Sequence, residues 1–512
     1  MGTFLVKWYS KNISKVDKIT FISTFVIGML THFFKFTNTL MNADSVLNFY
    51  RDQNILASGR WFLAIACGFS SFYDLPWIIG IISILFISLT AVIIVRLFKI
   101  ENPIVASIIG GLITTFPAIT KTFSYGFTAD GYMMAMFLSA VAVYITQIGD
   151  KKLYKYFIST ICICLSCGIY QSYLSFFLVL VLCYFIYELF ENNYSKKEYL
   201  LYVRNSIVIV VIALILYYII WKICMFIQGV QPTDYQGINS AGKISISVII
   251  NAIISSIAIV IRFFMGGVDD ISKMDTLGIL NILFLVFALV IFIITIRKTK
   301  IYKSRFHMFW LILALVLIPF CVCIWYFTSS EVYYYLVMLQ SLCVPYILIT
   351  VMCDKWCKIK FSNVYALLIT IIVFNFAVSA NISYFYLQKT NEESYATGAE
   401  MMSRIHMLES SKTTKIAFVG SLPDNELKSI AYNDKVNIVN SGNCTENLLS
   451  DNLHAYKFLN HFYSLNLDTV TSEELEEISK SKQISEMGIW PSNNSVAVID
   501  NTIVIKLSEV NQ

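Results

Sequence analysis

Eleven apolar stretches, each close to bilayer length, dominate the chain and constrain what it can fold into. They cover residues 19–34, 76–95, 103–119, 130–148, 153–169, 172–190, 205–227, 278–296, 308–327, 333–352 and 363–386. A helix needs roughly 20 mostly apolar residues to cross the hydrocarbon core of a bilayer. The content of 57% hydrophobic and 14% charged residues is also beyond what a soluble core explains. The sequence therefore predicts an all-α polytopic membrane domain, residues 1–387, with about eleven transmembrane helices.

The loops between these stretches alternate between rich and poor in basic residues. Through residue 387, one set of loops carries 20 Lys and Arg residues and the other set carries 8. Because cytoplasmic loops carry the excess of basic residues, the N-terminus is predicted to be cytoplasmic. The 35–75 loop, the 120–129 turn, the 228–277 segment and everything after about residue 387 then lie on the outer face. Only Tyr170, Gln171 and Ser172 divide the stretches 153–169 and 172–190. If these two stretches formed one span, the predicted orientation of every later span would be reversed. The positions of the basic loops argue against that reversal.

The tail, residues 388–512, has a different composition. It holds 17 of the 33 acidic residues and only 10 of the 38 basic ones. Strands are predicted at 415–419, 435–439 and, as a hairpin, 496–505, and helices at 452–465 and from the capping box of Thr471 and Glu474. The tail therefore reads as a small extracytoplasmic α/β domain. It has no phosphate loop or metal motif, so it is expected to assist with the acceptor or with assembly.

Charged residues near the membrane plane are the first candidates for chemistry, because such positions mark sites or pathways. Asp44, Arg51, Asp52 and Arg60 lie together in the first outer loop. The pattern from Asp44 to residue 55 is helical and predicts an amphipathic helix lying on the bilayer. Asp44 and Asp52 are candidate catalytic acids, although Asp52 fits equally well on the solvated face of an interfacial helix.

Four further outer residues are candidates in or beside the 120–129 turn and the Tyr170 break. Asp130 begins the fourth stretch, where a carboxylate either caps a helix or serves a site. Lys121 opens the same turn and is a candidate phosphate contact. Tyr170 and Gln171 divide two spans, and polar side chains at such breaks commonly line a cavity.

A second outer amphipathic stretch is predicted at 246–264. Arg262 near its end could hold a phosphate or extend to lipid headgroups. No residue set favours a metal, since one or two carboxylates without histidine make a poor site for a transition metal. No cofactor is predicted, and the requirement for a divalent metal stays open.

An outer-face carboxylate with cations beside it suits transfer of a sugar from a lipid phosphate. The anomeric carbon of such a donor lies just above the bilayer, and the phosphate is a ready leaving group. The reaction needs a base for the acceptor hydroxyl and cations for the departing phosphate. Asp44 could be that base, and Arg60 or Arg262 those cations.

Five short motifs, in this order, resemble the serotype-converting glucosyl transferases of bacterial O-antigen and related surface glycans. They are Asn42-Ala-Asp44, Ser58-Gly-Arg-Trp61, Thr128-Ala-Asp130, Gly168-Ile-Tyr-Gln171, and Trp490-Pro491 with the segment 496–507. The resemblance spans nearly the whole chain. It implies an inverting multi-span enzyme of the GT-C type in the bacterial inner membrane, which takes glucose from undecaprenyl phosphate on the outer face.

Position by position, the resemblance makes Asp44 the catalytic base and Arg60 a structural or phosphate contact. It makes Asp130, Tyr170 and Gln171 contributors to the pocket. Members often show two adjacent acids in the first loop, whereas Ala43 precedes Asp44 here, so a second acid is left to Asp52 or Asp130. The implied partners are the undecaprenyl-phosphate-linked donor, a glycan acceptor, the lipid bilayer, a flippase and a donor-synthesising glycosyltransferase, with no role for nucleic acid.

Three other classes remain open on the sequence alone. A glycan-lipid flippase or transporter also needs many spans, but such proteins commonly carry internal repeats, and none is found here. An O-antigen polymerase would typically carry a large outer loop late in the series, where this chain has only the moderate 228–277 segment. A non-enzymatic membrane scaffold would tolerate loss of Asp44, Arg60 and Asp130 together.

Overall fold

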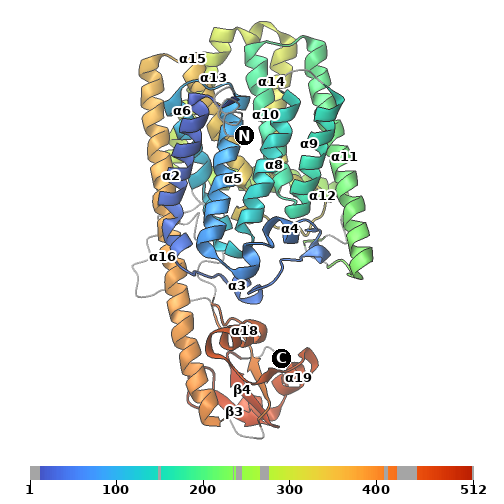
Figure 1. Ribbon diagram of the computed structural model, residues 1–512, viewed down its shortest axis with the longest axis vertical. Helices are drawn as coiled ribbons and strands as arrows, with labels where there is room; N and C mark the ends of the chain where they lie inside the picture. The colour runs from blue at the N-terminus through green and yellow to red at the C-terminus, as the bar shows by residue number, and fades with distance from the viewer. Residues whose placement is uncertain are drawn as a thin grey trace, which may run out of the picture. The chain divides into compact units, whose positions relative to one another are not determined.

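A computed structural model describes residues 12–147, 152–233, 236–237, 245–265, 276–408, 413–423 and 447–509 (Figure 1). The described chain forms two compact units. Unit 1 contains the residues up to Asn38 and the segment Tyr50–Asn381. Unit 2 contains the short segment Thr39–Phe49 and, among the described residues, the chain from Ile382 onward. The sequence-based boundary at residue 387 falls inside a single long helix.

Unit 1 is a bundle of long helices, as the apolar stretches predict. Its helices are α2 (Lys15–Thr37), α5 (Pro76–Leu97), α6 (Pro103–Thr115), α7 (Pro117–Ser124), α8 (Ala129–Gln147), α9 (Leu153–Ile169), α10 (Tyr173–Glu191), α11 (Lys196–Gln228), α12 (Ile246–Met265), α13 (Thr276–Thr299), α14 (Arg305–Val322), α15 (Cys343–Trp356) and the first part of α16 (Ile359–Leu408). Short helices and 3₁₀ turns connect them: α4 (Leu63–Cys67), η1 (Leu56–Ser58), η2 (Ser71–Tyr73), η3 (Gly126–Thr128), η5 (Ile301–Lys303), η6 (Ile324–Phe327), η7 (Leu336–Met338) and η8 (Gln340–Leu342).

Among the described residues, nine helices are long and apolar enough to cross a membrane, or ten if the pair α6 and α7, bent by 41°, forms one span. The chain is therefore a multi-pass membrane protein. The predicted stretches differ from these helices in three places. The stretch 153–169 is a helix of 17 residues, the stretch 333–352 begins in the 3₁₀ turns η7 and η8, and 246–264, predicted as an outer amphipathic stretch, is counted among the nine.

Helix packing within unit 1 follows chain order at first. Helix α2 packs on α5 and α6, α5 packs on α8, and α8 packs on α9 (Figure 1). Helix α10 is the most deeply buried of the nine, and α14 packs along it. A bidentate pair joins two helix ends, because Arg96 of α5 donates to both carboxylate oxygens of Asp17 at 2.9 and 2.8 Å. Such paired geometry is the strong form of a charged hydrogen bond.

The described residues of unit 2 form a four-stranded sheet in the order β2 (Asp468–Thr469), β1 (Lys415–Val419), β4 (Thr502–Lys506) and β3 (Val496–Ile499). Strand β1 pairs parallel with β2 and β4, and β3 and β4 form the predicted antiparallel hairpin. The helices are α18 (Asn452–Tyr463), α19 (Ser472–Ser479), α20 (Lys482–Glu486) and the later part of α16. The capping box of Thr471 and Glu474 is present. The predicted strand at 435–439 lies outside the described residues.

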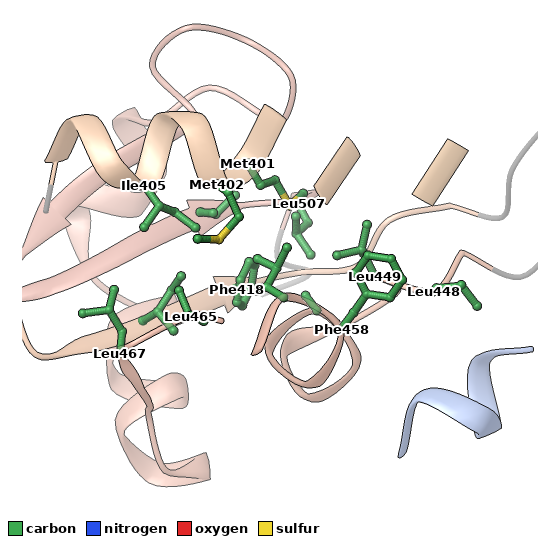
Figure 2. Packing of buried hydrophobic residues seen from close by; sticks show 14 of the residues in the cluster. Met401, Met402, Ile405, Phe418, Leu448, Leu449, Phe458, Leu465, Leu467 and Leu507 are labelled. Carbon is green, nitrogen blue, oxygen red and sulfur yellow. The ribbon is translucent and has the colours of Figure 1, made fainter. Parts of the chain in front are cut away.

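Alternate residues of the sheet face two separate cores. Ile416 and Phe418 of β1 contribute to one cluster, with Met401, Met402 and Ile405 of α16 and Phe458 of α18 (Figure 2). Ala417 and Val419 of the same strand contribute to the other cluster, under α19 and α20. Because strand side chains alternate between faces, this pattern covers both sides of the sheet.

A segment from the loop 35–75, the predicted first outer loop, is part of the core of unit 2. Helix α3 (Ala43–Leu47) packs against α18, and Met41 and Val46 are buried in the cluster with Phe458. Asn391 of α16 accepts from the Met41 amide at 3.0 Å and donates to the Met41 carbonyl at 2.8 Å. Phe49 stacks on His461 with ring centroids 4.1 Å apart. Residues about 350 positions apart in the sequence thus share one core.

The predicted amphipathic helix from Asp44 to residue 55 is wrong. Helix α3 ends at Leu47, and Tyr50 and Gln53 have the left-handed φ values of 50° and 55°. The physical reason is that the apolar side chains have different packing partners. Val46 enters the core of unit 2, whereas Leu56, which directly follows the predicted helix, packs on Trp221 and Met225 of α11. A helix with one continuous apolar face toward lipid is therefore not formed.

The packing of Val46 gives a prediction about unit 2. The substitution Val46→Ala removes two methyl groups from a side chain that is 1% exposed, and such losses cost about 1 kcal/mol or more. Hydrogen exchange in α18 should become faster while exchange in α13 stays unchanged. Val498→Ala is the matched control, because Val498 is 45% exposed. Unchanged exchange in α18 would show that the segment does not stabilise unit 2.

Candidate functional site

Two of the sequence motifs meet in unit 1. The loop Ser58–Trp61 lies against the break Gly168–Gln171 between α9 and α10. The Phe62 amide donates to the Gly168 carbonyl at 2.8 Å, and Gln171 Nε2 donates to the Ser58 carbonyl at 2.8 Å. These bonds satisfy backbone groups at a helix end, which otherwise lack partners. The motifs are therefore two halves of one structure.

Glycine is required on both sides of this contact. Gly59 has a φ of 85°, and a Cβ there would lie 2.3 Å from the Tyr217 hydroxyl and 2.5 Å from Gln171 Nε2. A Cβ on Gly168 would lie 2.6 Å from the Trp61 ring. Glycine alone adopts the left-handed conformation without strain and permits such close approach. The small residues in the motifs thus have a structural cause.

Arg60 is held in a fixed position by two tyrosines. Its guanidinium carbon lies 4.7 Å from the centroid of the Tyr170 ring, and Nη1 donates to the Tyr132 hydroxyl at 3.2 Å. The rings of Tyr132 and Tyr170 are stacked, with centroids 4.7 Å apart and an interplanar angle of 10°. A cation over a tyrosine face is attracted by the ring quadrupole. The positive charge is therefore oriented before any ligand arrives.

Helix α11 contacts both the Ser58–Trp61 loop and the Gly168–Gln171 break. The Tyr217 hydroxyl donates to the Gly59 carbonyl at 3.0 Å and accepts from Gln171 at 2.8 Å. Trp221 Nε1 donates to the Leu56 carbonyl at 2.8 Å. Lys222 is exposed, and its ammonium lies 5.2 Å from the Trp221 ring and 5.5 Å from the Tyr218 ring. A second cation thus accompanies Arg60.

These groups line a cavity of about 460 Å³ within unit 1. Cations, amides, hydroxyls and aromatic rings share its wall. The lining residues are Ser58, Arg60, Tyr170, Gln171, Ser172, Tyr217, Tyr218, Trp221, Lys222, Pro232, Gln236, Gly237, Trp325, Thr328, Val332 and Met338. A concave site with aromatic walls and a few convergent polar groups is the usual form of a small-molecule site. Two cations suit it to an anionic group such as a phosphate.

Three of the predicted site residues, Arg60, Tyr170 and Gln171, therefore come together in one cavity. The others are placed elsewhere among the described residues. Asp52 is exposed and accepts from the Asn54 amide at 3.2 Å. Arg262 is exposed on α12, and Lys121 is buried in α7 with its ammonium 5.9 Å from the Tyr125 ring. Asp44 is exposed in the first turn of α3 and belongs to unit 2.

Asp130 ties the first outer loop to α8. Its carboxylate is buried and accepts hydrogen bonds from the hydroxyls of Ser70 and Ser71, the latter at 2.9 Å, and from the Gly131 amide at 2.9 Å. Charged groups in the interior need such bonds to offset lost hydration. Of the two roles the sequence allowed, these contacts describe the structural one. A catalytic role for Asp130 stays a prediction.

Asp74 is a further acid of this loop, beside Asp44 and Asp52, and sequence reasoning did not select it. Its carboxylate accepts from the Tyr50 amide at 2.8 Å, which joins the two ends of the segment from Tyr50 to Asp74. Burial raises the pKa of Asp74 to about 6, and the Tyr50 bond and the charge of Lys35 oppose the rise. A buried acid whose charged form loses hydration behaves in this way. Asp74 thus closes the loop that carries Arg60.

Sequence reasoning also missed Tyr217, Trp221, Lys222 and Trp325 as lining residues. The signal that could have found them is their place at the outer ends of predicted spans, where aromatic and basic residues also anchor helices in the interface. Because interfacial anchoring is the common role of such residues, the sequence alone does not distinguish a ligand-binding role. Among the residues that the structure describes, no three His, Cys, Asp or Glu side chains gather as a metal site would require.

The fold and site together define a multi-pass membrane protein with a cation-bearing, aromatic cavity at a break between helices. The sequence matches the family Glucosyl transferase GtrII over residues 33–376. That range covers most of the 512 residues. The chain belongs to this family, and the protein is a membrane glucosyltransferase. No curated protein and no solved structure matches the chain. The resemblance to the serotype-converting family is thereby confirmed, and a flippase, a polymerase and a scaffold are disfavoured.

The close contact at Gly168 gives a prediction for the site. In Gly168→Ala, the added methyl group would displace the Trp61 ring and with it the loop that carries Arg60. We expect glucosyl transfer to fall by about tenfold or more, because displacing a positioned group by a fraction of an ångström is costly. Gly126→Ala is the control, since its nearest neighbour would be the flexible end of Lys35 at 3.6 Å. Normal transfer by Gly168→Ala would show that the contact is not needed.

Proposed function

We propose that this enzyme transfers a hexose, glucose by family, from undecaprenyl phosphate to a surface glycan such as O-antigen. The reaction is placed on the outer face of the bacterial cytoplasmic membrane, with the N-terminus in the cytoplasm and unit 2 outside. The observation that carries the proposal is the cavity in which Arg60 is fixed between tyrosines with Lys222 nearby. A phosphate with an attached sugar matches these cations and the surrounding amides and rings.

The step is a single displacement at the anomeric carbon. The acceptor hydroxyl oxygen forms a bond to that carbon, and the bond between the carbon and the phosphate oxygen breaks. The bonding electron pair leaves with undecaprenyl phosphate, whose charge Arg60 and Lys222 stabilise. The hydroxyl proton passes to a carboxylate base, which we assign to Asp44. Inversion at the anomeric carbon follows from the single displacement.

Three observations support Asp44 as the base. Its side chain is exposed, so an acceptor in water can reach it. Asn42, the N-cap of α3, accepts from the Ser45 amide at 3.0 Å and fixes the turn on which Asp44 lies. The surrounding segment is anchored in the core of unit 2 through Met41 and Val46. The acid is therefore accessible and sits on a supported backbone.

The substitution Asp44→Asn tests this assignment. The amide keeps the shape of the side chain but cannot take a proton, so turnover should fall by about 10² to 10⁴, the usual contribution of a general base. Transfer from purified undecaprenyl-phosphate glucose to isolated acceptor glycan is the measurement. Asp468→Asn is the matched control, because Asp468 is an exposed acid of the same unit. Near-normal turnover by Asp44→Asn would move the base to Asp52 or Asp130.

We further propose that unit 2 serves catalysis by holding this segment. Asn391 is buried, and its amide bonds both the amide and the carbonyl of Met41. A side chain that pairs with a distant backbone in this way fixes the path of the chain, and losing it leaves two buried groups without partners. Asn391 is thus a positioning residue for Asp44.

In Asn391→Leu we expect turnover to fall by about tenfold while the KM for the donor stays within about twofold, since positioning acts on the chemical step. Asn381→Leu is the control on the same helix, because Asn381 donates to the Thr31 carbonyl of α2 and both residues belong to unit 1. A rise in donor KM with unchanged turnover would contradict the positioning role. Loss of protein from the membrane fraction would show a folding role instead.

The accompanying partners follow from the donor chemistry. A sugar attached to undecaprenyl phosphate must be made by a donor-synthesising glycosyltransferase and moved across the bilayer by a flippase before it reaches an outer-face site. Its acceptor is a glycan that is also presented on the outer face. The lipid bilayer is the remaining partner, because the donor stays embedded in it.

A further inference from the structure

A second, apolar cavity of about 250 Å³ lies on the flank of unit 1. Three helices line it: α10 from Phe177 to Phe185, α11 from Tyr202 to Val211, and α14 from Trp310 to Cys321. Nearly all of the side chains along these stretches are aliphatic or aromatic, and Tyr202 directs its hydroxyl to the Val181 carbonyl at 3.0 Å. We call this cavity the flank groove.

The groove exists because two of its walls do not pack on each other. Helix α14 packs along α10, and α11 packs along α9, whereas the described residues of α11 and α14 make few mutual contacts (Figure 1). Helix α10 therefore forms the bottom of the gap between α11 and α14. Ile207 and Val211 form an exposed lip, at 58% and 49% exposure. An apolar hollow with an exposed apolar lip faces lipid in a membrane protein.

The same elements that line the flank groove also line the site cavity. Tyr170–Ser172 leads directly into α10, Tyr217–Lys222 continues α11, and Trp325 and Thr328 follow α14. The two cavities lie close together along α11, since only five residues separate Val211 of the flank groove from Tyr217 of the site cavity. At 1.5 Å per residue, the two cavities together extend about 30 Å along α11, from Tyr202 to Lys222. This length is comparable to the hydrocarbon core.

The two cavities differ sharply in chemistry. The site cavity has Arg60 and Lys222 in its lining, whereas the flank groove has no charged residue in its lining. At the end away from the site cavity, Phe185 stacks on Tyr202 with centroids 5.4 Å apart, and Trp310 lies edge-on to Phe185 at 6.0 Å. A ligand that fills both cavities has an anionic head group and a long, narrow apolar chain.

We infer that the flank groove between α10, α11 and α14 binds the prenyl chain of the lipid-linked donor whose phosphate and sugar occupy the site cavity. This inference rests on the proposed function and adds to it the path of the chain. A bulk phospholipid also carries a phosphate, but it has two acyl chains, whereas a donor held by its head places a single chain along the continuation of the same three helices. Burial of the chain then adds apolar contact to the charge contacts of the head.

The test uses two donors and two neighbouring variants of the full-length enzyme. Val210 lines the groove, and Val208, on the same helix and 46% exposed, does not. Val210→Trp fills the groove, and Val208→Trp places the same side chain toward lipid. The donors are undecaprenyl-phosphate glucose and geranyl-phosphate glucose, whose chain of two isoprene units is too short to fill the groove.

For Val210→Trp we expect kcat/KM with the undecaprenyl donor to fall by about tenfold, as overpacking of a filled site does. With the geranyl donor it should stay within about twofold, which also shows that the variant is folded. Val208→Trp should match the wild type with both donors. Leu317→Trp, from the α14 wall of the groove, should repeat the selective loss.

Other results of these assays would contradict either the inference or the proposed function. Equal effects on both donors in Val210→Trp and Leu317→Trp, or no effect on either, would overturn the assignment of the groove. The same selective loss in Val208→Trp would overturn it too, because the chain would then lie on the lipid face of α11. Failure of the wild-type enzyme to use either prenyl-phosphate donor would instead refute the proposed function.

Discussion

The docking of the Ser58–Trp61 loop on the Gly168–Gln171 break is the contact on which the site depends. It brings backbone groups from the first outer loop to the end of α9, and it needs glycine on both sides. Without it, Arg60 would not lie over Tyr170, and Gln171 would not join Tyr217 to the Ser58 carbonyl. In lipid every backbone polar group needs an internal partner. A break between helices is therefore stable only where another segment supplies those partners, and here that segment also brings the cation.

This arrangement explains why three of the lining residues, Arg60, Tyr170 and Gln171, could be selected from the sequence. A polar break between two apolar stretches is visible in the sequence, and Arg60 next to two small residues is visible in the loop. Pairing the two required only the resemblance to a family in which both occur. The roles of Tyr217 and Trp221 could not be predicted, because an aromatic residue at the end of a span is expected there for interfacial reasons. Only the fold shows that these rings turn toward the loop.

The first outer loop shows the opposite outcome. From Asp44 to residue 55 the apolar residues have helical spacing, yet the helix stops at Leu47. Helical spacing shows that apolar side chains could lie on one face of a helix. It does not show that they pack against the same part of the protein. Val46 and Leu56 are buried against different parts of the chain. By contrast, the strand β1, the hairpin of β3 and β4, the helix α18 and the capping box of the tail were predicted closely, because each depends on signals a few residues apart.

The weak packing between α11 and α14 has a consequence for turnover. A crevice that is open along the side of a bundle has no closed ring through which a long carrier must be threaded. For the lipid-linked donor that we propose, fresh donor and spent carrier would exchange by diffusion in the plane of the membrane, entering and leaving sideways through this opening. The number of isoprene units in the proposed carrier would then govern how tightly it is held and, through its dissociation rate, how fast it is replaced.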